Sequence, residues 1–128
     1  MVDSGIYFSR EELQCSCEAC GHACPMDDDF ITVIDQLRSL YGRPLKISSG
    51  FRCPDHNEKV SSTGRSGPHT TGKACDFYVA RGNAFELTKL IFTLPFTGVG
   101  FQQKGAGRFI HVDMLRSPEA VRPTVWSY

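Results

Sequence analysis

The feature of this sequence that most constrains its fold is a set of polar side chains inside otherwise apolar segments. One segment reads His69-Thr-Thr-Gly-Lys-Ala-Cys-Asp76, and a later one reads Phe109-Ile-His-Val-Asp113. A buried histidine or aspartate without a partner destabilises a protein, so these groups are expected to serve a common polar purpose. Imidazole and carboxylate groups that converge are good ligands for first-row metals such as zinc. The sequence therefore predicts a fold that brings the two segments together.

The spacing within each segment predicts where the side chains point. Alternate residues of a strand face the same side, so Asp76 points away from the more apolar face of its strand, and His111 and Asp113 share one side. His69, Asp76 and His111 as three ligands leave one tetrahedral position open, which is typical of catalytic zinc. One carboxylate against a divalent ion leaves positive charge to activate water and polarise a carbonyl. The alternative is a loop histidine and a strand aspartate that make ordinary hydrogen bonds.

Length and composition limit the class of protein. The 128 residues suffice for one domain with a single core, and 41% hydrophobic with 22% charged residues indicates a globular protein. The 14 lysines and arginines balance 14 aspartates and glutamates, whereas nucleic-acid-binding proteins usually carry a basic excess, so we expect no nucleic-acid partner. No apolar run approaches the ~20 residues of a membrane span, so we expect no membrane partner. We expect a monomer.

The cysteines allow two interpretations. Of six in the chain, four lie close together: Cys15, Cys17, Cys20 and Cys24. In a reducing compartment this cluster favours a structural metal site or free thiols, and in an oxidising one it favours disulfides. The spacing is not a standard zinc-finger spacing. His22 would be a ligand only if the cluster binds metal, and Cys53 and Cys75 are either a further pair or small buried apolar residues.

The order of predicted elements indicates the fold class. Acidic residues at 27–29 precede an apolar stripe of helical period that ends at Gly42, which predicts an amphipathic helix. The further predicted elements are a helix at 85–94 and strands at 45–49, 74–79, 99–102 and 109–115. Residues 50–68 are predicted to form a long loop, which would contain His56 in a turn, and residues 117–128 an irregular tail anchored by Trp126. Helices and strands mix without regular βαβ alternation, so the predicted class is α+β.

The pattern HxxGxAxD followed by HxD resembles the zinc D-Ala-D-Ala peptidases, whose superfamily includes lysostaphin-type enzymes and the hedgehog signalling domain. The match looks closest to short phage-associated or bacterial members. Phe8-Ser-Arg-Glu-Glu-Leu13 before the cysteines and Ser49-Gly-Phe-Arg52 extend the resemblance, which spans Phe8 to Trp126. It implies a small single domain, residues 1–128, with a mostly antiparallel sheet and helices packed on one face. Within it we distinguish a cysteine-rich segment (1–26), a catalytic core (27–116) and a tail (117–128).

The resemblance also implies roles for single residues. The zinc ligands would be His69, Asp76 and His111. Arg52 would contact the substrate and stabilise the developing oxyanion, for which a planar, permanently charged guanidinium is suited. A surface or turn position is the alternative for Arg52.

The general base departs from the family pattern. Many relatives place an acidic residue three positions before the last histidine ligand, or a histidine two before it, and this chain has Arg108 and Phe109 there. Asp113 is the nearest replacement, because it lies on the same side of the strand as His111. Two alternatives stay open: Asp113 is the third ligand and His111 the base, or Asp113 only orients a histidine.

The predicted function is a zinc metallopeptidase that hydrolyses peptide bonds in peptidoglycan stem peptides through a metal-activated water. Carboxypeptidase and endopeptidase action are both compatible with the sequence, and the loop at 50–68 would cover the cleft. The alternative is a cell-wall or protein binding module with a vestigial zinc site, since the usual base is absent. The start of the chain lacks a secretion signal, so we expect synthesis in the cytoplasm, or in the host cytoplasm if phage-encoded, and action at the cell wall.

Overall fold

A five-stranded sheet organises the fold of the computed structural model, which describes residues 1–128. The strands are β1 (Lys46–Ser49), β2 (Ala74–Tyr78), β3 (Gly98–Gln102), β4 (Phe109–Asp113) and β5 (Thr124–Ser127). Their spatial order is β1-β2-β4-β3-β5, with β3–β5 parallel and the other pairs antiparallel. The predicted α+β class with a mostly antiparallel sheet is confirmed.

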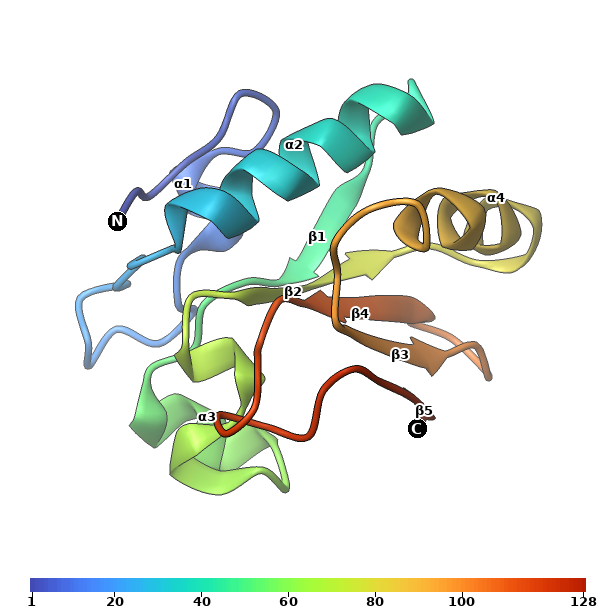
Figure 1. The fold of residues 1–128 in the computed structure, drawn as a ribbon. Helices are drawn as coiled ribbons and strands as arrows, with labels where there is room; N and C mark the ends of the chain where they lie inside the picture. Colours follow the sequence, from blue (N-terminus) through green and yellow to red (C-terminus); the bar gives the residue numbers. More distant parts are fainter.

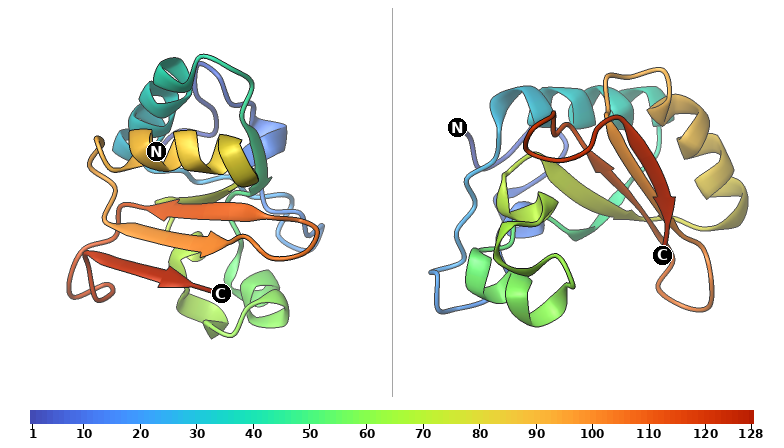
Figure 2. Two further views of the ribbon diagram at one scale, coloured as in Figure 1. Left: turned by 90° about the vertical axis from the view of Figure 1, so that its right-hand side faces the viewer. Right: turned by 60° about the horizontal axis from the view of Figure 1, so that its bottom comes forward.

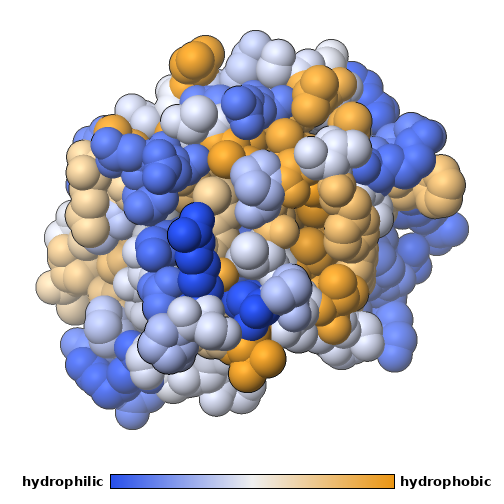
Figure 3. All heavy atoms as spheres, viewed as in Figure 1, coloured by the Kyte–Doolittle hydropathy of each residue, from blue (hydrophilic) through white to orange (hydrophobic).

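The helices lie on both sides of this sheet. They are α1 (Arg10–Leu13), α2 (Asp28–Tyr41), α3 (Pro54–Val60) and α4 (Arg81–Ile91), with 3₁₀ turns η1 (Gly64–Ser66) and η2 (Pro68–Thr70). Figure 1 shows α2 and α4 on one side, as expected, and the short α3 on the other. Hydrophilic residues predominate over α3 in Figure 3, whereas hydrophobic ones gather towards α4. No helix combines the length and the apolar character that crossing a membrane requires.

Helix α2 forms where its sequence pattern predicts. Asp27 caps its start by accepting a hydrogen bond from the Phe30 amide, and Gly42 ends it in the left-handed conformation. Phe30, Ile34 and Leu37 of the apolar stripe are fully buried. The stripe therefore faces the sheet, and each large side chain that it buries contributes about 2 kcal/mol.

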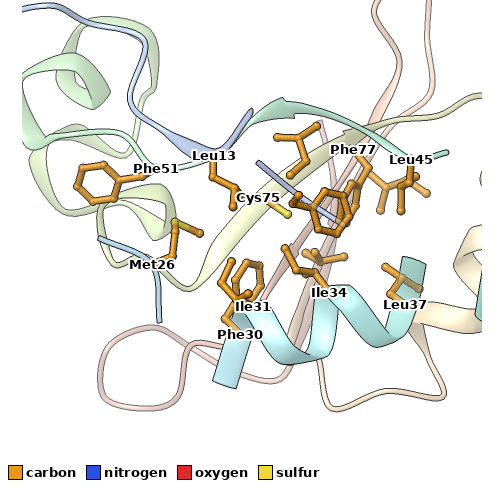
Figure 4. Close-up of a cluster of buried hydrophobic side chains, with 14 of the residues drawn as sticks. Leu13, Met26, Phe30, Ile31, Ile34, Leu37, Leu45, Phe51, Cys75 and Phe77 are labelled. Carbon is orange, nitrogen blue, oxygen red and sulfur yellow. The ribbon is translucent and has the colours of Figure 1, made fainter. Parts of the chain in front are cut away.

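The core lies between α2, α4 and one face of the sheet. Cys75 and Phe77 of β2 point into it, as the alternation predicts (Figure 4). They lie across from Val112 and Ile110 of β4, which belong to the same buried cluster. Because side chains alternate along a strand, Asp76 of β2 and His111 of β4 must point to the face of the sheet opposite the core. The core thus fixes the orientation of the polar residues on the open face of the sheet.

Two predictions of irregular structure are wrong. Residues 50–68 contain α3 and η1 instead of one long loop, and the tail at 117–128 contains β5. In Figure 2, β5 lies at the edge of the sheet beside β3. Trp126 anchors the tail as expected, with its ring 5.1 Å from that of His111. Both elements are short. Helix α3 buries only Asn57 and so has no apolar stripe, and β5 forms by pairing with β3, which a local pattern does not contain.

Candidate active site

Three buried side chains meet on the open face of the sheet. Asp76 in β2 lies directly across from His111 in β4, and His69 comes from the η2 turn that precedes β2. One ligand atom from each of the three lies within 4.8 Å of the others. The exposed fractions are 5% for His69, 5% for Asp76 and 1% for His111. The structure thus brings together the three residues that the sequence predicts as metal ligands.

Backbone contacts set the orientation of His69. Its Nδ1 lies 2.8 Å from the carbonyl oxygen of Gly50. A carbonyl only accepts hydrogen bonds, so Nδ1 carries the proton and donates it. The Nε2 atom then has a free lone pair and lies 3.3 Å from Oδ1 of Asp76. His69 therefore presents Nε2 to the centre of the site.

His111 lies between two carboxylates. Its Nδ1 is 2.9 Å from Oδ1 of Asp76, and its Nε2 donates to Oδ2 of Asp113 at 2.7 Å. Asp113 also accepts two hydrogen bonds from Arg122, from Nε at 2.9 Å and from Nη2 at 2.7 Å. Because Asp113 holds Nε2, the atom of His111 that faces the centre is Nδ1.

The charges of the site stabilise its carboxylates in the ionised form. Burial raises the pKa of Asp76, but the hydrogen bond from His111 and the nearby His69 imidazole outweigh it, so its pKa falls well below the usual range. Burial likewise opposes ionisation of Asp113, yet Arg122 and His111 lower its pKa to about 2. Burial lowers the pKa of His111, whereas Asp113 and Asp76 raise it more, with a net increase. Two imidazoles and an ionised carboxylate are a donor set that fits zinc.

The position of Asp113 differs from the one that its predicted role as general base requires. The side chain is fully buried, and it binds His111 on the ring nitrogen that faces away from Asp76. Arg122 engages both of its oxygens. A general base must lie within hydrogen-bond reach of the water that it deprotonates. This geometry agrees with the alternative in which Asp113 orients His111, and disfavours Asp113 as a ligand.

Arg52 lies beside the three residues and is held from two sides. Its Nε donates to Oγ of Ser49 at 3.1 Å and its Nη1 to Oδ1 of Asn57 at 3.0 Å. The Nη2 atom lies 3.8 Å from Oδ2 of Asp76. Asn57 is itself fixed, because its Nδ2 donates to Oγ1 of Thr63 at 2.9 Å. The guanidinium is therefore positioned at the site and not free in solvent.

Arg52, His69, Asp76 and His111 line a cavity of ≈ 920 Å³, within the usual range for small-molecule sites. Aromatic side chains line its walls: Tyr78, Phe109, Trp126 and Tyr128. Tyr78 shares the Asp76 face, as the alternation predicts. Among the lining residues Asp76 is the only one with a carboxylate side chain. Arg108, at one of the usual base positions, instead donates from Nε to the carbonyl of Gly105.

Sequence reasoning missed three residues that build the site. Asn57 positions Arg52, Arg122 pairs with Asp113, and Trp126 packs on His111. Asn57 follows His56 in the sequence, where an uncharged amide between ionisable neighbours was the available signal. Arg122 and Trp126 belong to the tail, and nothing local links them to β4.

Two glycines of β3 leave room for side chains of the site. A Cβ atom at Gly98 would lie 2.3 Å from Oδ1 of Asp113, and one at Gly100 would lie 2.5 Å from Nε1 of Trp126. Either approach is closer than non-bonded atoms allow. The two glycines leave the space that the carboxylate and the indole occupy.

The cysteine cluster has a different membership from the predicted one. The four thiols that converge are Cys15, Cys17, Cys20 and Cys53. Cys24 lies apart, with Sγ 3.4 Å from the carbonyl of Asp3, and Cys75 is buried in the core, so the pair Cys53–Cys75 is also wrong. Long-range folding, which the spacing does not encode, brings Cys53 into the cluster.

The other two histidines, His22 and His56, belong neither to the three buried residues of the cleft nor to the cysteine cluster. His22 bonds through Nδ1 to the carbonyl of Cys15, and His56 lies in the first turn of α3, with Nε2 3.1 Å from Oγ of Ser16. The expected turn around His56 is thus helical, and neither group of ligand atoms includes these histidines.

Comparison with known proteins relates the chain to cell-wall enzymes. A family model described as Peptidase M15 matches residues 6–113. The peptidoglycan L,D-endopeptidase MepK of Escherichia coli (strain K12) is 28% identical over 90 residues, covering 63% of this chain and 48% of the relative. MepK of Shigella flexneri matches with the same values. The chain thus spans about half the length of the curated relatives it matches.

Proposed function

Because the chain belongs to the M15 family of peptidases, we propose that it is a zinc-dependent metallopeptidase that hydrolyses peptide bonds in the stem peptides of bacterial peptidoglycan. The observation that carries this proposal is the convergence of His69, Asp76 and His111 within 4.8 Å at the floor of a large cleft. The substrate class is supported by the named relatives, which are peptidoglycan endopeptidases.

The residues of this chain prepare the centre for a divalent ion. Nε2 of His69, a carboxylate oxygen of Asp76 and Nδ1 of His111 would hold it, because Gly50 and Asp113 occupy the remaining imidazole nitrogens. When bound, zinc supplies Lewis-acid chemistry that polarises a carbonyl and strengthens water as a nucleophile near neutral pH. Arg122 keeps Asp113 ionised and so preserves the orientation of His111.

The cleft positions the substrate around this centre. The guanidinium of Arg52, held by Ser49 and Asn57, provides donors for the oxygen that becomes negative as the scissile carbonyl is attacked. Donors that are fixed in advance stabilise that charge without reorganisation. The aromatic side chains that line the cleft offer apolar surface on which a peptide can pack.

We assign endopeptidase action in preference to carboxypeptidase action. The named relatives are endopeptidases, and the cavity of ≈ 920 Å³ has space for residues on both sides of the scissile bond. A binding module is the second candidate, and one observation favours it. Apart from Asp76, no carboxylate side chain lines the cleft, so a general base of the usual kind is missing.

Turnover separates the two candidates. Purified sacculi are incubated with the protein, with and without zinc, and soluble products are identified by mass spectrometry. A synthetic pentapeptide ending in D-Ala-D-Ala serves as the carboxypeptidase substrate in a parallel reaction. The matched control is Asp76→Asn, which replaces the carboxylate with an amide of the same size.

Each candidate function predicts a different result in these assays. Zinc-dependent release of peptides from sacculi, absent from Asp76→Asn, supports the endopeptidase. Release of D-alanine from the pentapeptide alone would instead indicate a carboxypeptidase. If the zinc-loaded protein binds sacculi in a sedimentation assay but releases nothing from either substrate, the binding module replaces the enzyme.

A further inference from the structure

A second group of metal-ligating side chains lies outside the cleft and is not used by the proposed peptidase chemistry. Cys15, Cys17 and Cys20 come from the N-terminal segment, and Cys53 immediately precedes α3. We propose that Cys15, Cys17, Cys20 and Cys53 bind a structural zinc ion as four thiolates. This ion would fasten the N-terminal segment to the chain that carries Arg52.

The distances between the sulfur atoms support four-coordinate binding. Sγ of Cys17 lies 3.6 Å from that of Cys15, 3.3 Å from that of Cys20 and 3.4 Å from that of Cys53. With Zn–S bonds of about 2.3 Å, the edge of a tetrahedron of sulfurs is about 3.8 Å. Sγ of Cys17 thus needs to move only a few tenths of an ångström from each of these neighbours around an ion, and all four sulfurs lie within 4.8 Å of one another.

The arrangement differs from that of two disulfides. A disulfide pairs each sulfur with one partner, whereas Sγ of Cys17 lies at similar distances from three others. In a tetrahedron every sulfur has three equivalent neighbours. A set of four thiolates that closes the coordination sphere is the donor set of structural zinc sites.

Backbone amides provide the groups that thiolates need around them. The amide of Cys53 donates to Sγ of Cys15 at 3.4 Å, and the amide of His56 donates to Sγ of Cys53 at 3.4 Å. Four thiolates exceed the charge of a divalent ion by two, so N–H donors on the sulfurs stabilise the excess negative charge. Cys15 and Cys53 are buried, which fits a structural role.

The proposed site is connected to the cleft through residues 50–53. On one side, the amide of Phe51 donates to the carbonyl of Leu13 at 2.7 Å, and both side chains lie in the hydrophobic cluster (Figure 4). On the other side, the carbonyl of Gly50 accepts from His69, and the amide of Arg52 donates to the carbonyl of His69 at 3.0 Å. Loss of the thiolate-bound ion is therefore expected to loosen Arg52 and His69.

Metal content of the full chain, purified under a reducing agent, tests the proposal. We expect about two zinc ions per protein in the natural sequence and about one in Cys17→Ser. The matched control is Cys24→Ser, because Cys24 is a neighbouring cysteine outside the cluster and this variant is expected to retain both ions. The variant His69→Ala with His111→Ala removes the cleft ligands and is expected to retain the thiolate-bound ion.

Cobalt substitution identifies the ligands directly and does not depend on turnover. A cobalt-loaded protein is expected to show thiolate-to-cobalt charge-transfer absorption, which persists in the double histidine variant and disappears in Cys17→Ser. A charge-transfer band in the natural sequence supports the site even if Cys17→Ser does not fold. A protein that binds both ions yet hydrolyses nothing would contradict the proposed function and leave this inference standing.

Two results would overturn the inference. One is a single zinc ion in the natural sequence, with no thiolate band after cobalt loading. The other is a pair of disulfides among the four cysteines, found by mass spectrometry of alkylated protein that was never reduced after purification from its native compartment.

Discussion

At the scale of single residues, His111 links the candidate metal ligands to the residues that support them. Its two ring nitrogens have different partners, Asp76 at Nδ1 and Asp113 at Nε2, and Arg122 holds Asp113 in turn. A histidine ligand is oriented by the hydrogen bond of its other nitrogen, so the role of Asp113 is exerted through His111.

Asp113→Ala tests this assignment. Without the carboxylate, Nε2 loses its acceptor and the ring is free to change tautomer, so we expect zinc affinity to fall by about 10–100-fold. Competition titration against a zinc chelator measures the dissociation constant. Arg122→Ala is the companion variant and is expected to have the smaller effect, because the Asp113–His111 hydrogen bond remains. Unchanged zinc affinity with lost turnover would instead make Asp113 the general base.

Arg52→Lys tests the oxyanion contact. Lysine retains the charge but not the planar group that Ser49 and Asn57 hold, so the donors are no longer fixed. We expect kcat/KM to decrease on the order of a hundredfold with zinc content unchanged. Steady-state hydrolysis of a soluble muropeptide measures the effect, and Arg43→Lys on the exposed surface is the control. Equal rates for the two variants would remove Arg52 from the proposed chemistry.

At the scale of elements, β3 and β5 complete the site that β2 and β4 begin. β3 pairs with β4 so that Gly98 lies opposite Asp113 and Gly100 opposite His111. β5 adds Trp126 in parallel register with Gly100. The arrangement of side chains on the open face of the sheet thus depends on the two glycines of β3 and on Trp126 of β5.

Gly98→Ala is expected to disturb this arrangement. Its Cβ would lie 2.3 Å from Oδ1 of Asp113, so the carboxylate must shift, and we expect the free energy of unfolding to decrease by about 1–3 kcal/mol. Gly82→Ala is the matched control, since nothing lies within 4 Å of a Cβ atom at this first-turn position of α4, and alanine there is expected to change the free energy of unfolding by no more than about 0.5 kcal/mol. Urea unfolding followed by the fluorescence of Trp126 measures both. Equal stability of the two variants would show that β3 tolerates a side chain at Gly98.

The elements also show where sequence patterns suffice. Helix α2 has a capping aspartate, a long apolar stripe and a terminal glycine, and all three are local signals. In the sequences of β2 and β4, apolar residues alternate with the polar residues of the site, because one face of each strand packs in the core and the other faces the site. Helix α3 has local signals at its start, a cap from Cys53 and a proline in its first turn, but it has no apolar stripe because only Asn57 is buried. Strand β5 is short and forms by pairing with the distant β3.

At the scale of the whole molecule, the peptidase centre joins β2, β4 and the η2 turn, so metal binding is expected to be linked to folding. An ion that binds only the folded state stabilises it by about 2.7 kcal/mol at a free concentration of 100 times Kd. We expect Tm to rise with zinc, and chelation to abolish hydrolysis until zinc is restored. Differential scanning calorimetry of the natural sequence and Asp76→Ala measures the contribution of this centre. A zinc-dependent Tm increase of equal size in both would show that the cleft binds no ion.

Local patterns in the sequence were enough to predict the class of the fold and the three side chains that meet in the cleft. Strand alternation, a property of the local backbone, puts Asp76 and His111 on the open face of the sheet, and the HxxGxAxD spacing keeps His69 in the turn just before β2. The contacts of Asp113 with Arg122 and of Trp126 with His111, and the presence of Cys53 in place of Cys24, became apparent only in the folded protein. These pairings join residues from different segments of the chain. They depend on how the core packs the sheet against its helices, and no periodicity within a single segment carries that information.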